Sequence, residues 1–176
     1  DWVKRNNLAI RQRDYHALHW LLYVYLQQGR YRDAQELLTI MQKSLPEFPT
    51  DDPRMLAYGA YTQAGMAAAL VVETERWNDA DRLLPVSHVN VQDSKTSAAH
   101  DPSQAYAALT QIPAIFARGL AAAMTGAPEA HDSVAALRTI REQSTGAQEP
   151  FVGPILIMSE IQELEIAAAA AASKGD

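Results

Sequence analysis

Two histidines spaced three residues apart, His16 and His19, are the side chains whose arrangement most directly suggests chemistry. Residues at positions i and i+3 of a helix lie on one face, so the two imidazole rings could together ligate a transition metal. A complete site needs a third ligand, from another histidine or from a carboxylate such as Asp14, and the chain contains no His-Glu-x-x-His pattern. We therefore expect two hydrogen-bonded or solvated histidines, and we predict neither a metal nor a cofactor.

Residues that carry catalysis in other motif classes are also missing from the sequence. There is no Gly-x-Ser-x-Gly turn, no phosphate-binding glycine-rich loop and no cysteine nucleophile. Glu160, Glu163 and Glu165 are close in sequence, but on a helix only the first two approach a common face, and a solvated polar face explains them. We predict that the protein is not an enzyme.

The composition predicts an all-α protein. Hydrophobic residues make up 48% of the 176 residues, alanine is abundant, and alternating or β-branched runs are scarce. No apolar stretch reaches the roughly 20 residues that a bilayer span requires, so we expect no membrane insertion. The absence of cysteine fits a cytoplasmic, periplasmic or secreted location equally well. Because the sequence begins at Asp1 without a signal-peptide pattern, we expect a piece of a longer protein, and its localisation stays open.

The net charge of −6 is unevenly distributed along the chain. Residues 1–43 hold seven Lys and Arg against four Asp and Glu, whereas residues 44–176 hold eight against seventeen. Arginines near the N-terminus could recruit an acidic partner, but a solvated helix face explains them more simply. An acidic chain without a dense basic stripe is a poor ligand for nucleic acid, so we predict no such partner.

Turn and capping residues divide the chain into helices. Asp14 can cap the start of a helix that ends near Gln28, where Gly29 supplies a left-handed stop. Pro113 is expected to kink or divide the helical region that follows Asp101. The expected helices cover residues 14–28, 33–45, 54–73, 77–84, 102–125, 128–143 and 154–173.

Small, apolar and aromatic residues recur at fixed intervals after residue 14. They are Tyr15, Leu18, Leu21, Leu22, Tyr25, Gly29, Tyr31, Ala34, Leu38, Met41 and Pro46. This pattern resembles the 34-residue tetratricopeptide repeat (TPR), in which two antiparallel helices pack together and successive repeats stack into a solenoid. The likeness covers most of the chain, whose segments resemble those of uncharacterised bacterial proteins of that family.

The resemblance implies an α-solenoid of about three full helical hairpins with partial repeats at both ends. The expected units are residues 1–13 (the trailing helix of a partial repeat), 14–48, 54–84 and 102–144 (three repeats), 85–101 (an irregular loop) and 150–176 (the first helix of a truncated repeat). It also implies that the first helices of successive repeats build a concave binding wall. The wall positions in this sequence include His16, His19, Tyr23, Gln27, Phe116, Leu120 and Met124.

A wall of this composition predicts a protein or peptide partner held by aromatic and apolar contacts. Some members of the family hold C-terminal carboxylates with Lys, Arg and Asn, and none of those residue types stands at the wall positions here. Two alternatives stay open. One is a regulatory domain that senses a small molecule in an enclosed pocket lined by His19, Tyr23, Phe116 and Met124, and the other is a structural spacer without a preferred surface.

The last expected helix lacks the second helix that would complete its repeat. Its absence would leave apolar surface uncovered at Leu164 and Ile166. Uncovered apolar faces at the ends of solenoids favour self-association. We therefore expect that the protein can form a homodimer through its terminal helices.

Overall fold

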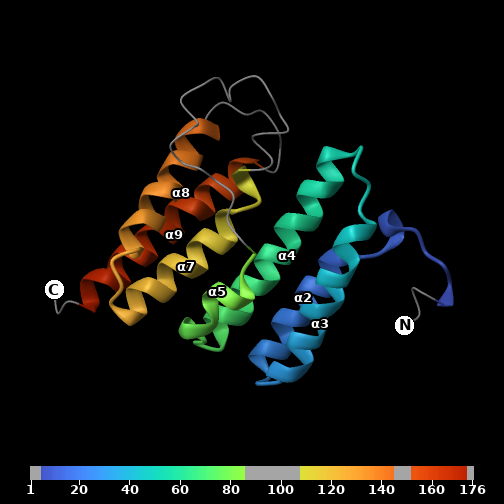
Figure 1. The fold of residues 1–176 in the computed structure, drawn as a ribbon, viewed down its shortest axis with the longest axis horizontal. Helices are drawn as coiled ribbons and strands as arrows, with labels where there is room; N and C mark the ends of the chain where they lie inside the picture. The colour runs from blue at the N-terminus through green and yellow to red at the C-terminus, as the bar shows by residue number, and fades with distance from the viewer. Residues whose placement is uncertain (1–4, 86–107, 145–151, 174–176) are drawn as a thin grey trace.

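The computed structural model describes residues 5–85, 108–144 and 152–173, and their regular structure is helical (Figure 1). The helices are α2 (Tyr15–Gln27), α3 (Tyr31–Ser44), α4 (Pro53–Glu73), α5 (Ala80–Leu83), α7 (Ile112–Thr125), α8 (Ala130–Ser144) and α9 (Val152–Ala172), with 3-10 turns η1 (Ile10–Gln12), η2 (Leu45–Glu47) and η3 (Trp77–Asp79). Within the described ranges there is no strand, so the predicted all-α class is confirmed.

Local chemistry sets where the helices begin and end. The Asp14 carboxylate accepts a hydrogen bond from the backbone N–H of Ala17 at 2.8 Å, which satisfies a free donor at the start of α2. Gly29 and Gly126, which follow α2 and α7, have φ angles of 69° and 74°, as expected of left-handed helix ends. Glu75 takes the same left-handed conformation after α4, with φ of 52°.

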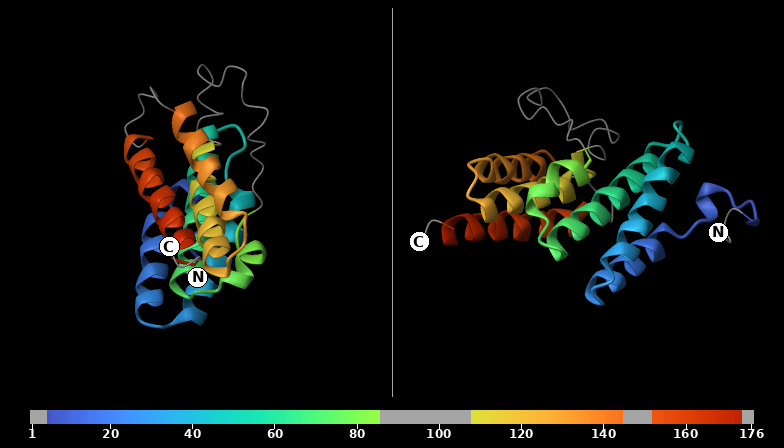
Figure 2. Two further views of the ribbon diagram at one scale, coloured as in Figure 1. Left: turned by 90° about the vertical axis from the view of Figure 1, so that its left-hand side faces the viewer. Right: turned by 60° about the horizontal axis from the view of Figure 1, so that its bottom comes forward.

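The helices lie side by side in a regular order (Figures 1 and 2). α2 and α3 pack as a hairpin, and both contact α4. On its other side α4 contacts α7, which in turn contacts α8 and α9, and α8 and α9 also pack together. α4 therefore lies between the N-terminal hairpin and the group formed by α7, α8 and α9.

The apolar interior is divided into two clusters that share α7. The first cluster lies among α2, α3, α4 and α5, and α7 adds Ala114, Ala117 and Ala121 to it. The second lies among α7, α8 and α9, and α7 adds Ile112 and Ile115. Each face of α7 thus closes a different part of the interior, and the described residues are not organised around one central core.

One expected helix differs from the structure, and one expected break is present. A helix was expected to run through residue 13, but residues 6–9 are not helical and only a 3-10 turn follows at Ile10–Gln12. Asn7 ends the preceding turn because its φ of 48° is left-handed. Pro113 was expected to kink or divide the helical region, and the structure divides it: residues 108–109 are helical, residues 110–111 form a turn, and α7 begins at Ile112. Pro113 lies in the first turn of α7, where its missing N–H leaves no hydrogen bond unmade.

The expected irregular loop, residues 85–101, lies outside the described residues apart from Pro85. The expected helix start at Asp101-Pro102 also lies outside them. The remaining boundaries agree within about two residues, with α8 beginning at Ala130 rather than residue 128 and α9 at Val152 rather than residue 154.

α4 is more apolar than the sequence-based reasoning allowed. By length and composition alone, Pro53–Glu73 could cross a membrane, and it is the one helix of the described ranges that meets this criterion. Half of its most apolar window is buried against other helices. A core helix that is covered on several sides has the same composition, and α4 packs against α2, α3 and α7.

Candidate functional site

Two of the four predicted wall residues of α2, His19 and Gln27, contact α4. Nε2 of Gln27 donates a hydrogen bond to Glu73 of α4 at 2.8 Å. The His19 ring lies so close to the backbone of Gly65 in α4 that a methyl group there would be 3.0 Å from His19 Cε1. Tyr23 falls between His19 and Gln27 in this stripe and is 42% exposed. The structure therefore joins His19 and Gln27 to α4.

His16 and His19 have different surroundings, and these do not converge on a metal position. Nε1 of Trp20 donates a hydrogen bond to Nε2 of His16 at 2.7 Å, which uses the lone pair that a metal would need. Burial, and secondarily the nearby His16, lowers the pKa of His19, which favours its neutral form. Among the residues that the structure describes, no group of three or more His, Cys, Asp or Glu side chains could hold a metal ion.

The three predicted wall residues of α7 form a separate group. Phe116 and Leu120 are partly buried and pack against the second apolar cluster. Met124 is half-exposed at the end of the helix. Because α4 lies between α2 and α7, the seven predicted residues form two patches instead of one continuous cluster.

α2 also exposes large apolar side chains that the sequence analysis did not assign to a site. They are Trp20, Leu21 and Val24, each at least two-fifths exposed. The signal was present as an unbroken apolar run from Trp20 to Leu26, which is longer than one buried stripe of a helix requires.

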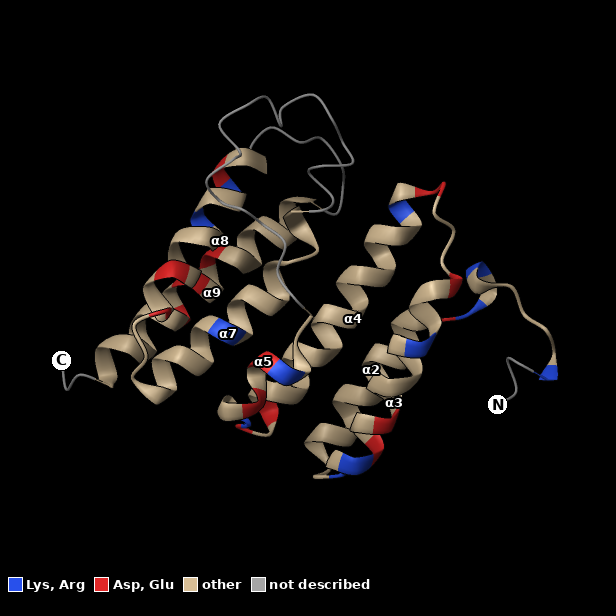
Figure 3. Ribbon diagram, viewed as in Figure 1, with Lys and Arg blue, Asp and Glu red and all other residues tan. Residues whose placement is uncertain are grey.

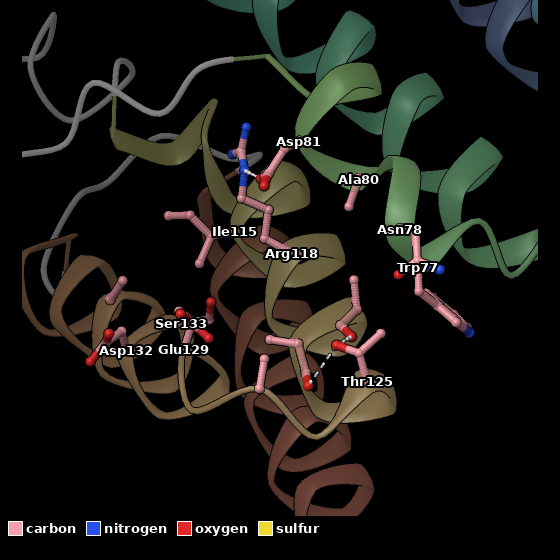
Figure 4. A pocket seen from close by; sticks show the side chains of 14 residues that line it. Trp77, Asn78, Ala80, Asp81, Ile115, Arg118, Thr125, Glu129, Asp132 and Ser133 are labelled. Atoms are coloured by element: carbon pink, nitrogen blue, oxygen red, sulfur yellow. Dashed lines mark hydrogen bonds and ion pairs between the residues drawn. The ribbon is translucent and has the colours of Figure 1, made fainter.

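A concavity lies on the side of α7 opposite Phe116 and Leu120 (Figure 4). We call it the α7 groove. η3 and α5 form one wall, α8 forms the other, and α7 forms the floor. Its volume is about 640 Å³, and its lining residues are Trp77, Asn78, Ala80, Asp81, Ile115, Arg118, Ala121, Ala122, Thr125, Ala127, Glu129, Asp132, Ser133 and Ala136.

The α7 groove combines an apolar floor with acidic walls. Asp81 belongs to one wall, and Glu129 and Asp132 belong to the other (Figure 4). The guanidinium of Arg118 lies 3.4 Å from Asp81 and donates a hydrogen bond to the carbonyl oxygen of Pro85 at 2.7 Å. Three carboxylates and one guanidinium line the groove, so its chemistry favours a cationic guest with apolar parts.

The size of the second helix in each hairpin explains the α7 groove. α3 has 14 residues and α8 has 15, but α5 has only four and follows a single 3-10 turn. A short second helix covers less of α7. The sequence predicted a short helix at residues 77–84, but it did not predict that this short helix would leave a groove beside α7.

Most of the N-terminal arginines are engaged in ion pairs. Figure 3 shows where the basic and acidic residues lie along the helices. Arg11 pairs with Asp52 at 2.5 Å, and Arg13 pairs with Glu47 at 2.6 Å. Further along the chain, Arg30 pairs with Asp33 at 2.7 Å. These pairs reduce the positive charge offered to an acidic partner.

The acidic group on α9 differs from the expected solvated face. Glu160 and Glu165 are exposed, but Glu163 is buried against α8, where Arg138 and Arg141 donate hydrogen bonds to its two oxygens. Burial raises the pKa of Glu163, but the two hydrogen bonds outweigh burial, so its pKa lies below its ordinary value. Glu163 therefore joins α9 to α8, and the expectation of a fully solvated trio was wrong.

The expected apolar surface on α9 is present at one of its two predicted positions. Leu164 is 64% exposed, whereas Ile166 is completely buried in the second cluster. Residues two apart on a helix point about 200° apart, so the two side chains necessarily face different sides.

Comparison with known proteins adds no constraint on function. No protein-family model, curated protein or solved structure matches this chain. The function must therefore be inferred from the arrangement of its own residues.

Proposed function

We propose that the chain is a TPR-like α-solenoid that binds a protein or peptide segment. The observation that carries the proposal is that three long helices end in the same way. α2, α4 and α7 are each followed by a residue with left-handed backbone, namely Gly29, Glu75 and Gly126, and then by a helix that packs back on them. Such a unit cannot bury its apolar face alone and needs a stacked neighbour.

The order of helix contacts also supports a solenoid. The first helices pack in succession, α2 on α4, α4 on α7 and α7 on α9, while α3 and α8 each contact their own first helix and the next one. The two apolar clusters meet at α7, as expected when each repeat completes the interior of its neighbour. The proposed binding face consists of the patch on α2 and the patch on α7, with α4 between them.

The composition of that face favours an extended or helical segment with apolar side chains. Tyr23 is a rigid aromatic group with one polar end, a type that contributes strongly to protein interfaces. Met124 offers a flexible thioether that adapts to different partners. Gln27 and Glu73 lie beside Tyr23 and can supply hydrogen bonds to a peptide backbone.

A peptide selection experiment tests the proposal. Peptides from a random displayed library would be selected on the chain, and their affinities would then be measured for the unmodified protein and for the Tyr23→Ala, Met124→Ala variant. We expect the double substitution to weaken binding at least about tenfold, which corresponds to about 1.4 kcal/mol.

The control is Tyr31→Ala, which removes an equally exposed tyrosine (49%) from α3, outside the proposed face. We expect this variant to bind as the unmodified protein does. Failure to select any peptide, or equal affinities for all three proteins, would contradict peptide binding at this face.

A second candidate function, recognition of a small organic cation, is favoured by the α7 groove. Its volume of about 640 Å³ lies within the range of small-ligand sites, and its walls are acidic. The residues first expected to enclose a ligand, among them His19 and Tyr23, do not line it. Spermidine should raise the melting temperature of the protein but not that of the Glu129→Gln, Asp132→Asn variant; equal responses would contradict this candidate.

A further inference from the structure

One side of α9 is fully used by the fold. Its buried residues Ser159, Glu163, Ile166 and Ala170 are spaced four, three and four apart. They face α7 and α8, with which α9 makes its main contacts. In Figure 2, α9 lies at the outside of the helical array beside these two helices. The interior of the described fold therefore needs only this side of α9.

The opposite side of α9 is also apolar. Ile157, Ile161 and Leu164 are 65%, 45% and 64% exposed, and Ala168 and Ala171 continue the same line of exposed residues. The intervals of four, three, four and three residues are those of the apolar seam of a coiled coil. We call these five residues the α9 seam. At about 1.5 Å per residue it is roughly 21 Å long.

Solvent exposure of this seam is unfavourable, because a helix with apolar residues on both sides is normally covered on both. An exposed line of large aliphatic side chains is typical of a helix that pairs with another helix. Among the described elements, none packs against the seam. A helix that covers the seam must match its apolar residues in size.

The sizes of the seam residues favour an antiparallel second copy of α9. The N-terminal half carries large side chains, and the C-terminal half carries alanines. In a parallel pair of identical helices, isoleucines would meet isoleucines at one end and hold the axes apart, so the alanines at the other end could not make contact. In an antiparallel pair, a large side chain at each end lies on an alanine of the other copy, and large side chains meet only at the centre, which gives more even packing than a parallel pair.

We propose that two copies of this chain associate through an antiparallel pairing of their α9 seams. The two-fold axis passes between Ile161 and Leu164, so that Ile161 of each copy packs on Leu164 of the second copy and Ile157 packs on Ala168. Glu160 and Glu165 are exposed and flank the seam on opposite sides, so the two copies of Glu160 lie on one flank of the pair and the two copies of Glu165 on the other, each pair about 7.5 Å apart along the helix axes. None of the residues of the proposed peptide-binding face belongs to the seam, so the two proposals are independent.

The mass of the protein in solution tests the association. We expect light scattering to give twice the chain mass of 19.3 kDa. Leu164→Glu should raise the dissociation constant of the dimer by more than about a hundredfold, because it places two carboxylates in an apolar contact. Ile40→Glu is the matched control, since Ile40 is 50% exposed on α3 and lies outside the seam.

A monomeric mass at protein concentrations up to about 1 mM would overturn the proposal, as would equal weakening by Leu164→Glu and Ile40→Glu. Circular dichroism of both variants checks that they fold. Since both side chains are exposed, we expect unchanged helical spectra.

Cysteine cross-linking tests the orientation, and the chain offers a clean background because it contains no cysteine. In the antiparallel pair, Ile157→Cys with Ala168→Cys should give a covalent dimer on oxidation. Ile157→Cys alone should not, because the two copies of residue 157 would be about 16 Å apart, beyond the reach of a disulfide. Cross-linking by the single variant would show a parallel pair and overturn the orientation.

Discussion

A methyl group at Gly119 would enter the place where α7, α8 and α9 meet. In a Gly119→Ala variant the new carbon would lie 2.6 Å from Cβ of Ser133 and 2.6 Å from Cδ1 of Ile166. Carbon atoms attract at about 3.5–4.0 Å, so each contact is too short by roughly 1 Å. Cδ1 of Ile166 can rotate away, but Cβ of Ser133 moves only if the α8 backbone moves.

The expected cost follows from two opposing effects. Overpacking a close-packed site costs about 1–3 kcal/mol, and we take the upper part of this range, about 2–3 kcal/mol, because one of the two short contacts is held by the backbone of α8. Alanine stabilises a helix by about 1 kcal/mol relative to glycine. The free energy of unfolding should therefore fall by about 1–2 kcal/mol. For a chain of this size the melting temperature should fall by roughly 2–8 °C.

Urea denaturation followed by circular dichroism measures this change. Gly153→Ala is a control, since Gly153 lies in α9 with nothing within 4 Å of the position of a methyl group apart from its chain neighbours. The gain in helix propensity is offset by Pro154, which disfavours a Cβ on the preceding helical residue, so this variant should have nearly the stability of the unmodified protein. If Gly119→Ala were as stable as Gly153→Ala, α8 would be free to move away from α7. Close packing of the last three helices would then be wrong.

Three further predictions concern an ion pair, a helix end and the histidines. Burial raises the pKa of Glu163, but hydrogen bonds from two arginines hold it below its ordinary value of 4.5. The stabilisation by ionised Glu163 is therefore complete above pH 4.5 and is lost as the pH falls through the lower pKa of the folded state. Glu163→Gln should make the free energy of unfolding less dependent on pH in this acidic range, and an unchanged dependence would contradict the assignment. Glu75→Gly should raise the free energy of unfolding by about 1 kcal/mol, because glycine adopts the φ of 52° without strain. Gly29→Ala should lower the free energy of unfolding by a similar amount, because it places a Cβ on a left-handed residue. A loss of stability in Glu75→Gly would refute this reasoning. Zinc and nickel should leave the melting temperature unchanged, since Trp20 occupies Nε2 of His16, and a rise of several degrees would restore the metal-binding hypothesis.

Features that depend on a few neighbouring residues were predictable from the sequence. The cap at Asp14 and the stops at Gly29 and Gly126 act within one helical turn, so their effect does not depend on the rest of the fold. The apolar pattern likewise fixed the all-α class, because helical burial repeats every three to four residues. The division before α7 was predictable for the same reason, since Pro113 is tolerated in the first turn of a helix but not in its interior.

Features that depend on which helices meet were not predictable. Glu163 has the same sequence surroundings as its exposed neighbours Glu160 and Glu165, and only the approach of Arg138 and Arg141 from α8 distinguishes it. The α7 groove exists because a short α5 and a full-length α8 flank the same helix. Its acidic walls come from residues up to 51 positions apart, Asp81 and Asp132, which no local pattern connects.

The sequence by itself determined that this protein is built from helices, where most of those helices begin and end, and which residues could carry a repeat. The tertiary structure decided that the predicted wall residues form two patches, that one glutamate of α9 is buried, and that an acidic groove lies on the other side of α7. The physical reason is the sequence distance over which each interaction acts. Capping and backbone preferences act between residues within one turn, whereas burial, pKa and groove shape depend on side chains that only packing brings together.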